Sequence, residues 1–130
     1  FCYAVFDTVA HECSYSIAGH PFPYRLTADG ELSELELGAY PLGASARAKF
    51  RQQSFNYSPG DLFVFYSDGI VEGVNPDDEQ YGFARFEQSI RRNALGCPEM
   101  INSAIMNDFR DFARGAPQQD DITLVIIKAV

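Results

Sequence analysis

The 130-residue sequence has few of the residues on which disulfide, zinc or histidine chemistry depends. Its three cysteines, Cys2, Cys13 and Cys97, are an odd number and form no C-x-x-C pair, which argues against a disulfide framework or a zinc site. We expect each to be a small apolar core residue in a reducing cytoplasm. Only His11 and His20 are present, and neither has an evident nucleophile partner, so a cysteine- or histidine-based hydrolase is disfavoured.

Long apolar runs and an excess of basic residues are also missing. No apolar stretch approaches the roughly 20 residues that cross a bilayer, and no basic start followed by an apolar block marks a signal peptide. Eighteen acidic against ten basic residues give a net charge of −8, which repels phosphate backbones. The sequence therefore predicts a cytoplasmic protein with no nucleic-acid partner and no membrane segment in this chain.

Apolar and aromatic residues are abundant, since 46% of the chain is hydrophobic and 11 Phe and 7 Tyr are present. A chain of this length forms at most one domain, with enough buried surface for a core. Residues 1–6 are apolar throughout, which is the pattern of a buried strand. Because the chain opens in the middle of such a pattern, we interpret it as a fragment of a longer protein.

The expected elements run from strands to two helices and back to a strand. Strands are expected at residues 1–6, 13–18, 24–27, 49–57, 62–66 and 122–127, with Leu32, Leu35 and Leu37 continuing the sheet beyond a hairpin turn at Asp29-Gly30. Apolar residues recur at helical spacing at Phe83, Phe86, Ile90 and Ala94, with Gly96 ending the helix, and again from Pro98 to Phe112, with Gly115 after the second helix. This order predicts an α+β fold.

Two of these strands carry aspartates at ends that can meet. Asp68-Gly69 follows the apolar run 62–66, whereas Asp120-Asp121 comes directly before the run 122–127. If the two strands are antiparallel neighbours, about 5 Å apart, the carboxyl groups converge on one sheet edge. A cation offsets the cost of gathering carboxylates, and Mg²⁺ and Mn²⁺ prefer oxygen ligands. The pattern predicts a shared metal site, although either pair alone could be an ordinary turn.

Several further motifs occur in order along the chain: Ala18-Gly19-His20-Pro21, Pro41-Leu42-Gly43, Gly60-Asp61-Leu62, Ser67-Asp68-Gly69-Ile70-Val71-Glu72, Asn75-Pro76, Tyr81-Gly82 and Asp120-Asp121-Ile122-Thr123. Together they resemble the metal-dependent serine/threonine protein phosphatase family (PPM), most closely its bacterial SpoIIE-type branch. The resemblance implies part of an αββα sandwich with antiparallel sheets and two C-terminal helices. Residues 1–130 would be the C-terminal portion of the phosphatase domain, with its N-terminal strands and helices missing.

The resemblance also implies a site in which aspartates hold Mn²⁺ or Mg²⁺ and an activated water attacks phosphoserine or phosphothreonine. Asp68 is similar to the metal-binding aspartate after the central strand and Asp120 to the one before the last strand, while Asp121 is a weaker candidate. No catalytic residue beyond these ligands is expected. The family's upstream aspartate and Asp-x-Ser-Gly-His-Gly motif are absent, and His20 is interpreted as structural. We therefore expect the fragment alone to be weak or inactive.

SpoIIE-type phosphatases typically act on a phosphorylated anti-anti-sigma (STAS) protein in partner-switching pathways that regulate sigma factors. Many carry an upstream sensory or receiver domain, so the resemblance implies both partners for this protein. Two alternatives stay open: a catalytically incomplete module that docks a STAS-type partner, and a structural α+β domain in which Asp68 and Asp120 lie apart. Without the N-terminal helices, one sheet face should be uncovered.

Overall fold

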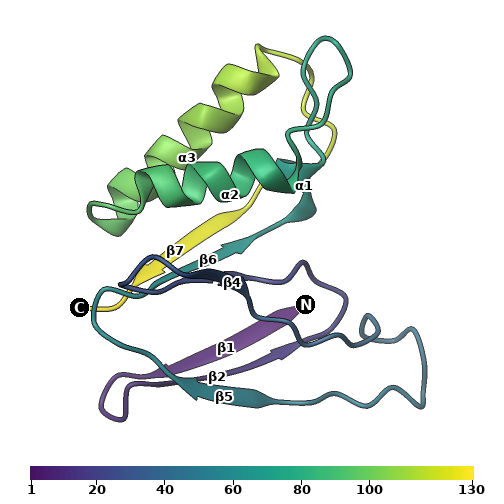
Figure 1. Ribbon diagram of the computed structural model, residues 1–130. Coiled ribbons are helices and arrows are strands. Elements are labelled where there is room, and N and C mark those ends of the chain that lie inside the picture. The colour runs from purple at the N-terminus through teal and green to yellow at the C-terminus, as the bar shows by residue number, and fades with distance from the viewer.

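The computed structural model describes residues 1–130 as two antiparallel sheets that pack face to face, with helices on one outer side (Figure 1). The first sheet has the order β1-β2-β5 and contains β1 (Cys2–Asp7), β2 (Glu12–Ile17) and β5 (Gln53–Asn56). The second has the order β4-β3-β6-β7 and contains β3 (Tyr24–Leu26), β4 (Leu32–Glu34), β6 (Leu62–Tyr66) and β7 (Leu124–Lys128). The predicted α+β class with antiparallel sheets is confirmed.

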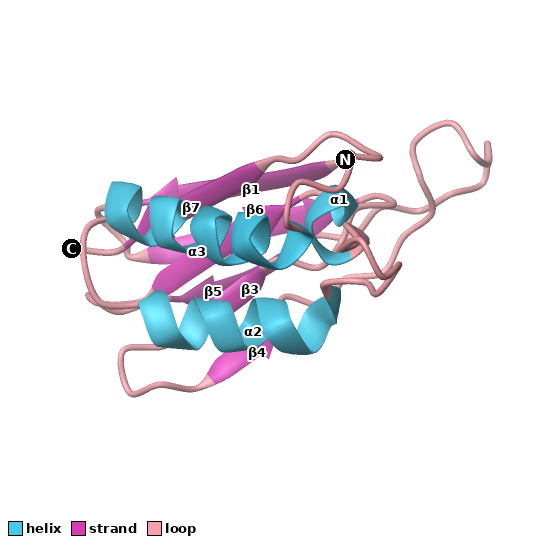
Figure 2. Ribbon diagram, turned by 90° about the horizontal axis from the view of Figure 1, so that it is seen from above, coloured by secondary structure: helices cyan, strands magenta, loops and turns pink.

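Three helices complete the chain: α1 (Asp68–Val71), α2 (Gly82–Asn93) and α3 (Pro98–Ala113). The two longer helices lie side by side across the outer face of the four-stranded sheet, as both ribbon views show (Figures 1 and 2). No helix is both long enough and apolar enough to cross a membrane. The two C-terminal helices expected from the sequence are therefore present, and the short helix α1 is an addition that the sequence pattern did not indicate.

β6 is buried on both faces because it lies between the helices and the first sheet. Leu62, Val64 and Tyr66 belong to a core cluster that includes Phe86 of α2. Phe63 belongs to a second cluster between the two sheets. All five side chains are at most 2% exposed, and burying a Leu, Val or Phe side chain fully contributes about 1.5–3 kcal/mol. The prediction of a doubly buried central strand is confirmed.

β1 is buried on one face only. Cys2, Ala4 and Phe6 pack against the cluster between the sheets, whereas Tyr3 and Val5 are 59% and 46% exposed. The expectation of a fully buried first strand is therefore wrong, because no layer of the structure covers the outer face of this sheet (Figure 1). The uncovered face agrees with the expected lack of the N-terminal helices.

The first half of the chain has less regular structure than its pattern predicted. The strand expected at residues 49–57 is confined to Gln53–Asn56, because β2 offers pairing partners only from Glu12 to Tyr15. Leu35 and Leu37 lie beyond the end of β4, yet both are buried between the sheets. The two leucines are spaced two residues apart, as in a strand, because both side chains enter the core, although the segment itself is not a strand.

The sequence signals correctly marked the ends of α3, but they were partly wrong about which residues face the core. Pro98 begins α3, and Arg114 caps it in the left-handed conformation, with φ of 49°. Phe83, expected on the buried face of α2, is 53% exposed. Cys97, expected in the core, is exposed at the N-cap of α3, whereas Cys13 is fully buried. Spacing alone did not identify which of these residues faces the sheet.

A polar cluster around Asp108 joins α2 to α3. The Asp108 carboxylate accepts hydrogen bonds from Ser89 Oγ at 2.5 Å and Asn93 Nδ2 at 2.8 Å, and it pairs with Arg92 at 2.5 Å. Burial alone would raise the pKa of Asp108, but the hydrogen bonds from these three side chains lower it below its ordinary value. The ionised carboxylate therefore holds the two helices together.

This lowered pKa predicts a pH-dependent part of the stability. Because folding favours the charged form of Asp108, its contribution is present at neutral pH and is lost as the pH falls below about 4. The Asp108→Asn variant should lose stability at pH 7 and show a smaller further loss on acidification than the parent chain. Urea unfolding at several pH values tests this, and an unchanged acid slope in the variant would contradict it.

A second polar cluster, centred on Asp61, links β3 to the turn before β6. Asp61 is 1% exposed and accepts bonds from Arg25 Nη2 at 2.6 Å and Nε at 3.1 Å, and from the backbone N–H groups of Ala28 and Ser58 at 3.1 Å. The Arg25 guanidinium also lies 4.7 Å from the centroid of the Phe55 ring in β5. One ion pair thus connects both sheets.

Replacing Asp61 by Asn should destabilise the fold by about 3 kcal/mol, because the partly buried Arg25 charge loses its partner. The matched control is Asp77→Asn, an exposed aspartate in the turn before α2, which should change the free energy of unfolding by less than about 0.5 kcal/mol. Chemical denaturation of both variants measures the difference. Equal stabilities for the two variants would show that the ion pair contributes nothing net.

Candidate metal centre

The end of β6 and the start of β7 meet at one edge of the four-stranded sheet. The two strands pair antiparallel, from Leu62 opposite Lys128 to Tyr66 opposite Leu124. Just beyond this ladder, Ser67 N donates to the Thr123 carbonyl at 3.0 Å. The structure thus brings together the two segments that carry the candidate aspartates.

The Ser67 hydroxyl fixes this contact through two further hydrogen bonds. Ser67 Oγ donates to the Asp121 carbonyl oxygen at 2.8 Å and accepts from the Thr123 backbone N–H at 2.8 Å. A Cβ on Gly69 would lie 2.5 Å from the same Asp121 carbonyl oxygen. Glycine is therefore required by the close approach of the two backbones, and the Ser67 hydroxyl bonds to two backbone groups across the junction.

The three candidate carboxylates are all exposed at this edge. Asp68 is the first residue of α1, and Asp120 Oδ1 accepts a hydrogen bond from the Asp121 backbone N–H at 2.7 Å. Asp120 lines a cavity of about 270 Å³ with Gly69 and Glu72, whereas Asp68 lines a neighbouring hollow that also includes Glu72. The two aspartates therefore border adjacent cavities, with Glu72 lining both.

Two more residues shape the hollow beside Asp68. Tyr66 and His20 both line it, and burial raises the pKa of Tyr66 to about 12, which keeps its hydroxyl neutral. The His20 ring nitrogen Nδ1 lies 2.8 Å from the Pro21 carbonyl oxygen, and the preceding Gly19 N–H donates to the Ala39 carbonyl at 3.1 Å. These bonds are consistent with the structural role expected for His20.

The carboxylates at this edge are ligands of the type that a hard divalent cation prefers, but too few of them are grouped to complete a site. Carboxylate oxygens are the ligands that Mg²⁺ and Mn²⁺ prefer, together with several waters. No group of three or more His, Cys, Asp or Glu side chains is placed to hold one ion. Residues 1–130 thus do not group enough of these side chains to complete a metal site by themselves, and the assignment of Asp68, Asp120 and Asp121 as ligands stays a prediction.

The sequence analysis named Ser67, Thr123 and Glu72 only as members of motifs and assigned them no role at the site. Glu72 follows Asp68 by four residues, and its N–H donates to the Asp68 carbonyl at 2.9 Å. That spacing places both carboxylates on one face of a helical turn. Glu72 could therefore have been identified from the sequence if a helix had been expected at α1. The role of Ser67 depends on a contact 54 residues away, which no local pattern reveals.

Residues 1–130 match the family model described as stage II sporulation protein E (SpoIIE). The chain belongs to the SpoIIE family. The resemblance to the SpoIIE-type branch of the metal-dependent protein phosphatases, which the ordered motifs predicted, is thereby confirmed. Because the match covers every residue, both aspartate motifs, Asp68-Gly69 and Asp120-Asp121, lie within the matched region.

Three similar proteins place this SpoIIE-family chain among phosphatase domains. Phosphoserine phosphatase RsbU of Bacillus subtilis is 32% identical over 71 residues, which is 54% of this chain and 21% of RsbU. The RsbU and RsbW domains of Rv1364c from Mycobacterium tuberculosis match at 29% identity with a TM-score of 0.75, covering 98% of this chain and 35% of that one. The Mn-presoaked phosphatase domain of SpoIIE from Bacillus subtilis has a TM-score of 0.75 at 17% identity, covering 99% and 56%.

The chain spans about a fifth of the length of the curated relatives that it matches. The matches show the phosphatase family and the fold. The 17% identity to the SpoIIE domain shows the fold alone. The activity, substrate and partners of the whole protein are therefore matters for proposal.

The close contact at Gly69 predicts a specific sensitivity to substitution. Gly69→Ala places a methyl group against the Asp121 backbone, which cannot yield as a flexible side chain would, and should cost about 1–3 kcal/mol of stability. The matched control is Gly38→Ala, where a Cβ has nothing within 4 Å. Denaturant unfolding of both variants tests the contact, and equal effects of the two substitutions would contradict it.

Proposed function

We propose that the protein containing this chain is a metal-dependent phosphoserine/phosphothreonine protein phosphatase. The observation that carries the proposal is the SpoIIE-family match over residues 1–130, combined with the meeting of the Asp68 and Asp120 segments at one sheet edge. The acidic edge is exposed and lies beside a cavity, so both a hard cation and a phosphate group can reach it from solvent. A purely structural domain would not require this placement.

In the proposed site, Asp68 and Asp120 hold Mn²⁺ or Mg²⁺, and Asp121 is a weaker candidate ligand. When bound, such ions supply an activated water and neutralise charge on the transferring phosphoryl group. The chain's own contribution is positional. Ser67 fastens the end of β6 to the residues before β7, and Gly69 allows the two backbones to approach closely enough for one site.

The proposed substrate is a phosphorylated anti-anti-sigma (STAS) protein in a cytoplasmic partner-switching pathway that regulates a sigma factor. Support comes from RsbU, a phosphoserine phosphatase by name, and from the chain of Rv1364c that holds RsbU and RsbW domains together. We also propose an upstream sensory or receiver domain, because the stretches that match this chain are only 20% and 21% of two curated relatives.

One alternative has a specific observation in its favour. Because no three metal-binding side chains are grouped in residues 1–130, the chain could serve as a phosphatase-like module that docks a STAS-type partner without turnover. The same observation supports the interpretation that residues 1–130 are the C-terminal portion of a phosphatase domain, weak or inactive alone. The two proposals differ in what a longer version of the chain does.

The decisive test is Mn²⁺-dependent phosphate release from a phosphoserine peptide by the full-length protein. Asp68→Asn and Asp120→Asn should each lower the rate by about 100-fold or more, because losing a ligand is at least as severe as losing the groups that orient it. Asp77→Asn is the control, since that aspartate is exposed and lines neither of the two cavities. Retained activity in both ligand variants would contradict the metal assignment.

The same assay on residues 1–130 and on an upstream-extended version separates the two proposals. Activity only in the extended version supports a site completed by residues outside this chain. If neither version is active but the extended one binds a phosphorylated STAS domain, the docking module is the better description.

A further inference from the structure

The loop between β4 and β5 carries positive charge on an otherwise acidic chain. Arg47, Lys49 and Arg51 lie in this loop, and residues 37–60 contain no aspartate or glutamate. The net charge of the whole chain is −8, so the remainder is more acidic still. A locally basic segment of this kind is an electrostatic feature that selects an anionic partner.

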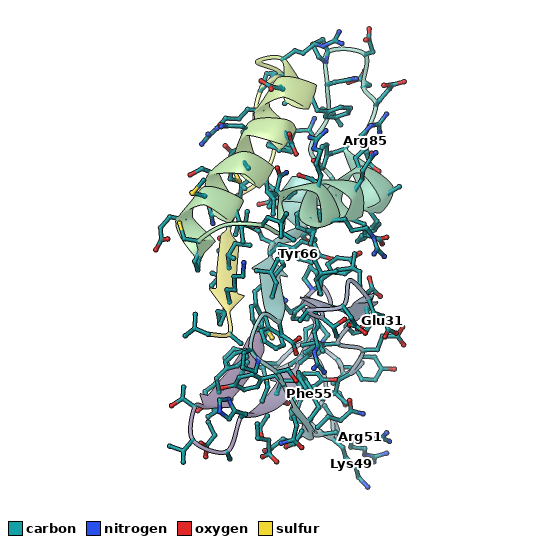
Figure 3. All side chains as sticks on the ribbon, turned by 60° about the vertical axis from the view of Figure 1, so that its left-hand side comes forward. Glu31, Lys49, Arg51, Phe55, Tyr66 and Arg85 are labelled. Atoms are coloured by element: carbon teal, nitrogen blue, oxygen red, sulfur yellow. The ribbon has the colours of Figure 1, made fainter.

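The three cationic side chains are exposed and unpaired. They line one shallow groove together with Tyr40, and the three ion pairs of the chain all lie elsewhere. Figure 3 shows Lys49 and Arg51 extending into solvent, away from the body of the sandwich. Because no carboxylate of this chain neutralises them, these charges are available to another molecule.

Exposed apolar side chains accompany the charges. Tyr40 is 71% exposed, Leu42 55% and Phe50 46%. Arginine and aromatic residues are enriched at protein–protein interfaces, whereas isolated surface charges need no apolar neighbours. The composition of the loop therefore favours a protein surface over a small ion.

The loop is attached to the same edge of the molecule as the candidate metal centre. Its start is held by the hydrogen bond from Gly19 N to Ala39 O, and a Cβ on Gly19 would lie 2.5 Å from Pro41 Cγ. The next residue, His20, lines the hollow that contains Asp68. Both ribbon views place the loop and α1 on the same side of the molecule (Figures 1 and 2).

We propose that the groove formed by Arg47, Lys49 and Arg51 docks an acidic surface beside the phosphoserine of the protein substrate. The substrate identity rests on the proposed function, whereas the docking does not require turnover. Nucleic acid is the poorer occupant, because the large acidic excess elsewhere on the chain repels an extended polyanion. A folded protein can place a local acidic patch on the loop and its phosphate at the acidic edge.

Binding of labelled peptides to the full-length protein tests the docking separately from catalysis. The probes are two fluorescein-labelled phosphoserine peptides of equal length, one with Asp and Glu around the phosphoserine and one with Gln and Ser. Fluorescence anisotropy should give about tenfold tighter binding of the acidic peptide at low ionic strength, and the preference should shrink as salt is added.

The variant Arg47→Gln/Lys49→Gln/Arg51→Gln should abolish that preference. Arg91→Gln, which removes an exposed charge at the end of α2, should keep it. Equal affinity of the parent protein for the two peptides, or a preference that survives in the triple variant, would overturn the docking assignment. Docking that persists in a protein without Mn²⁺-dependent turnover would support the groove and contradict the phosphatase proposal alone.

Discussion

The ion pair between Arg25 and Asp61 is the interaction on which the rest of the structure depends. A buried carboxylate is costly unless its oxygens are bonded, and Asp61 accepts four hydrogen bonds from three residues, Arg25, Ala28 and Ser58. Arg25 reaches in turn to the Asn56 carbonyl at 3.2 Å. The pair therefore fixes the turn before β6, the middle of β3 and the end of β5 at one point between the sheets.

Fixing the start of β6 also determines where that strand ends. With Asp61 held in place, Leu62 pairs with both Leu26 and Lys128, and the ladder runs without a bulge to Tyr66. A shift of one residue would turn the large core side chains of β6 to the opposite faces. The site edge is therefore positioned by the core, although Asp68 itself contributes nothing to packing.

The sequence was most informative where burial on both faces left a continuous apolar run, as in β6, and where a cap or turn residue marked an end, as at Pro98 and Gly30. The sequence was least informative where the burial of a side chain depends on whether another layer of structure covers its sheet. The sequence around Tyr3 would be the same whether or not another layer covered β1. Only the structure shows that Tyr3 lies on an uncovered face. For the site, the meeting of the two aspartate segments was predictable, because it follows from antiparallel pairing of β6 and β7. The sequence pattern does not indicate that Asp68 and Asp120 line different cavities, because this depends on how the side chains are placed.

Under the proposed function, the placement of charge would let an acidic chain recognise a phosphorylated protein. Asp68, Asp120 and Asp121 at the edge repel a phosphate group unless a cation lies between them, so in the absence of metal this edge would not attract the proposed substrate. In the proposed docking, the basic loop would supply that attraction from a separate point, and salt would weaken it because its charges are exposed. Separating the charge proposed to attract the protein from the charge proposed to bind the metal would let each act without neutralising the other. The anchoring of the loop through Gly19, next to His20, keeps both on the same side of the molecule.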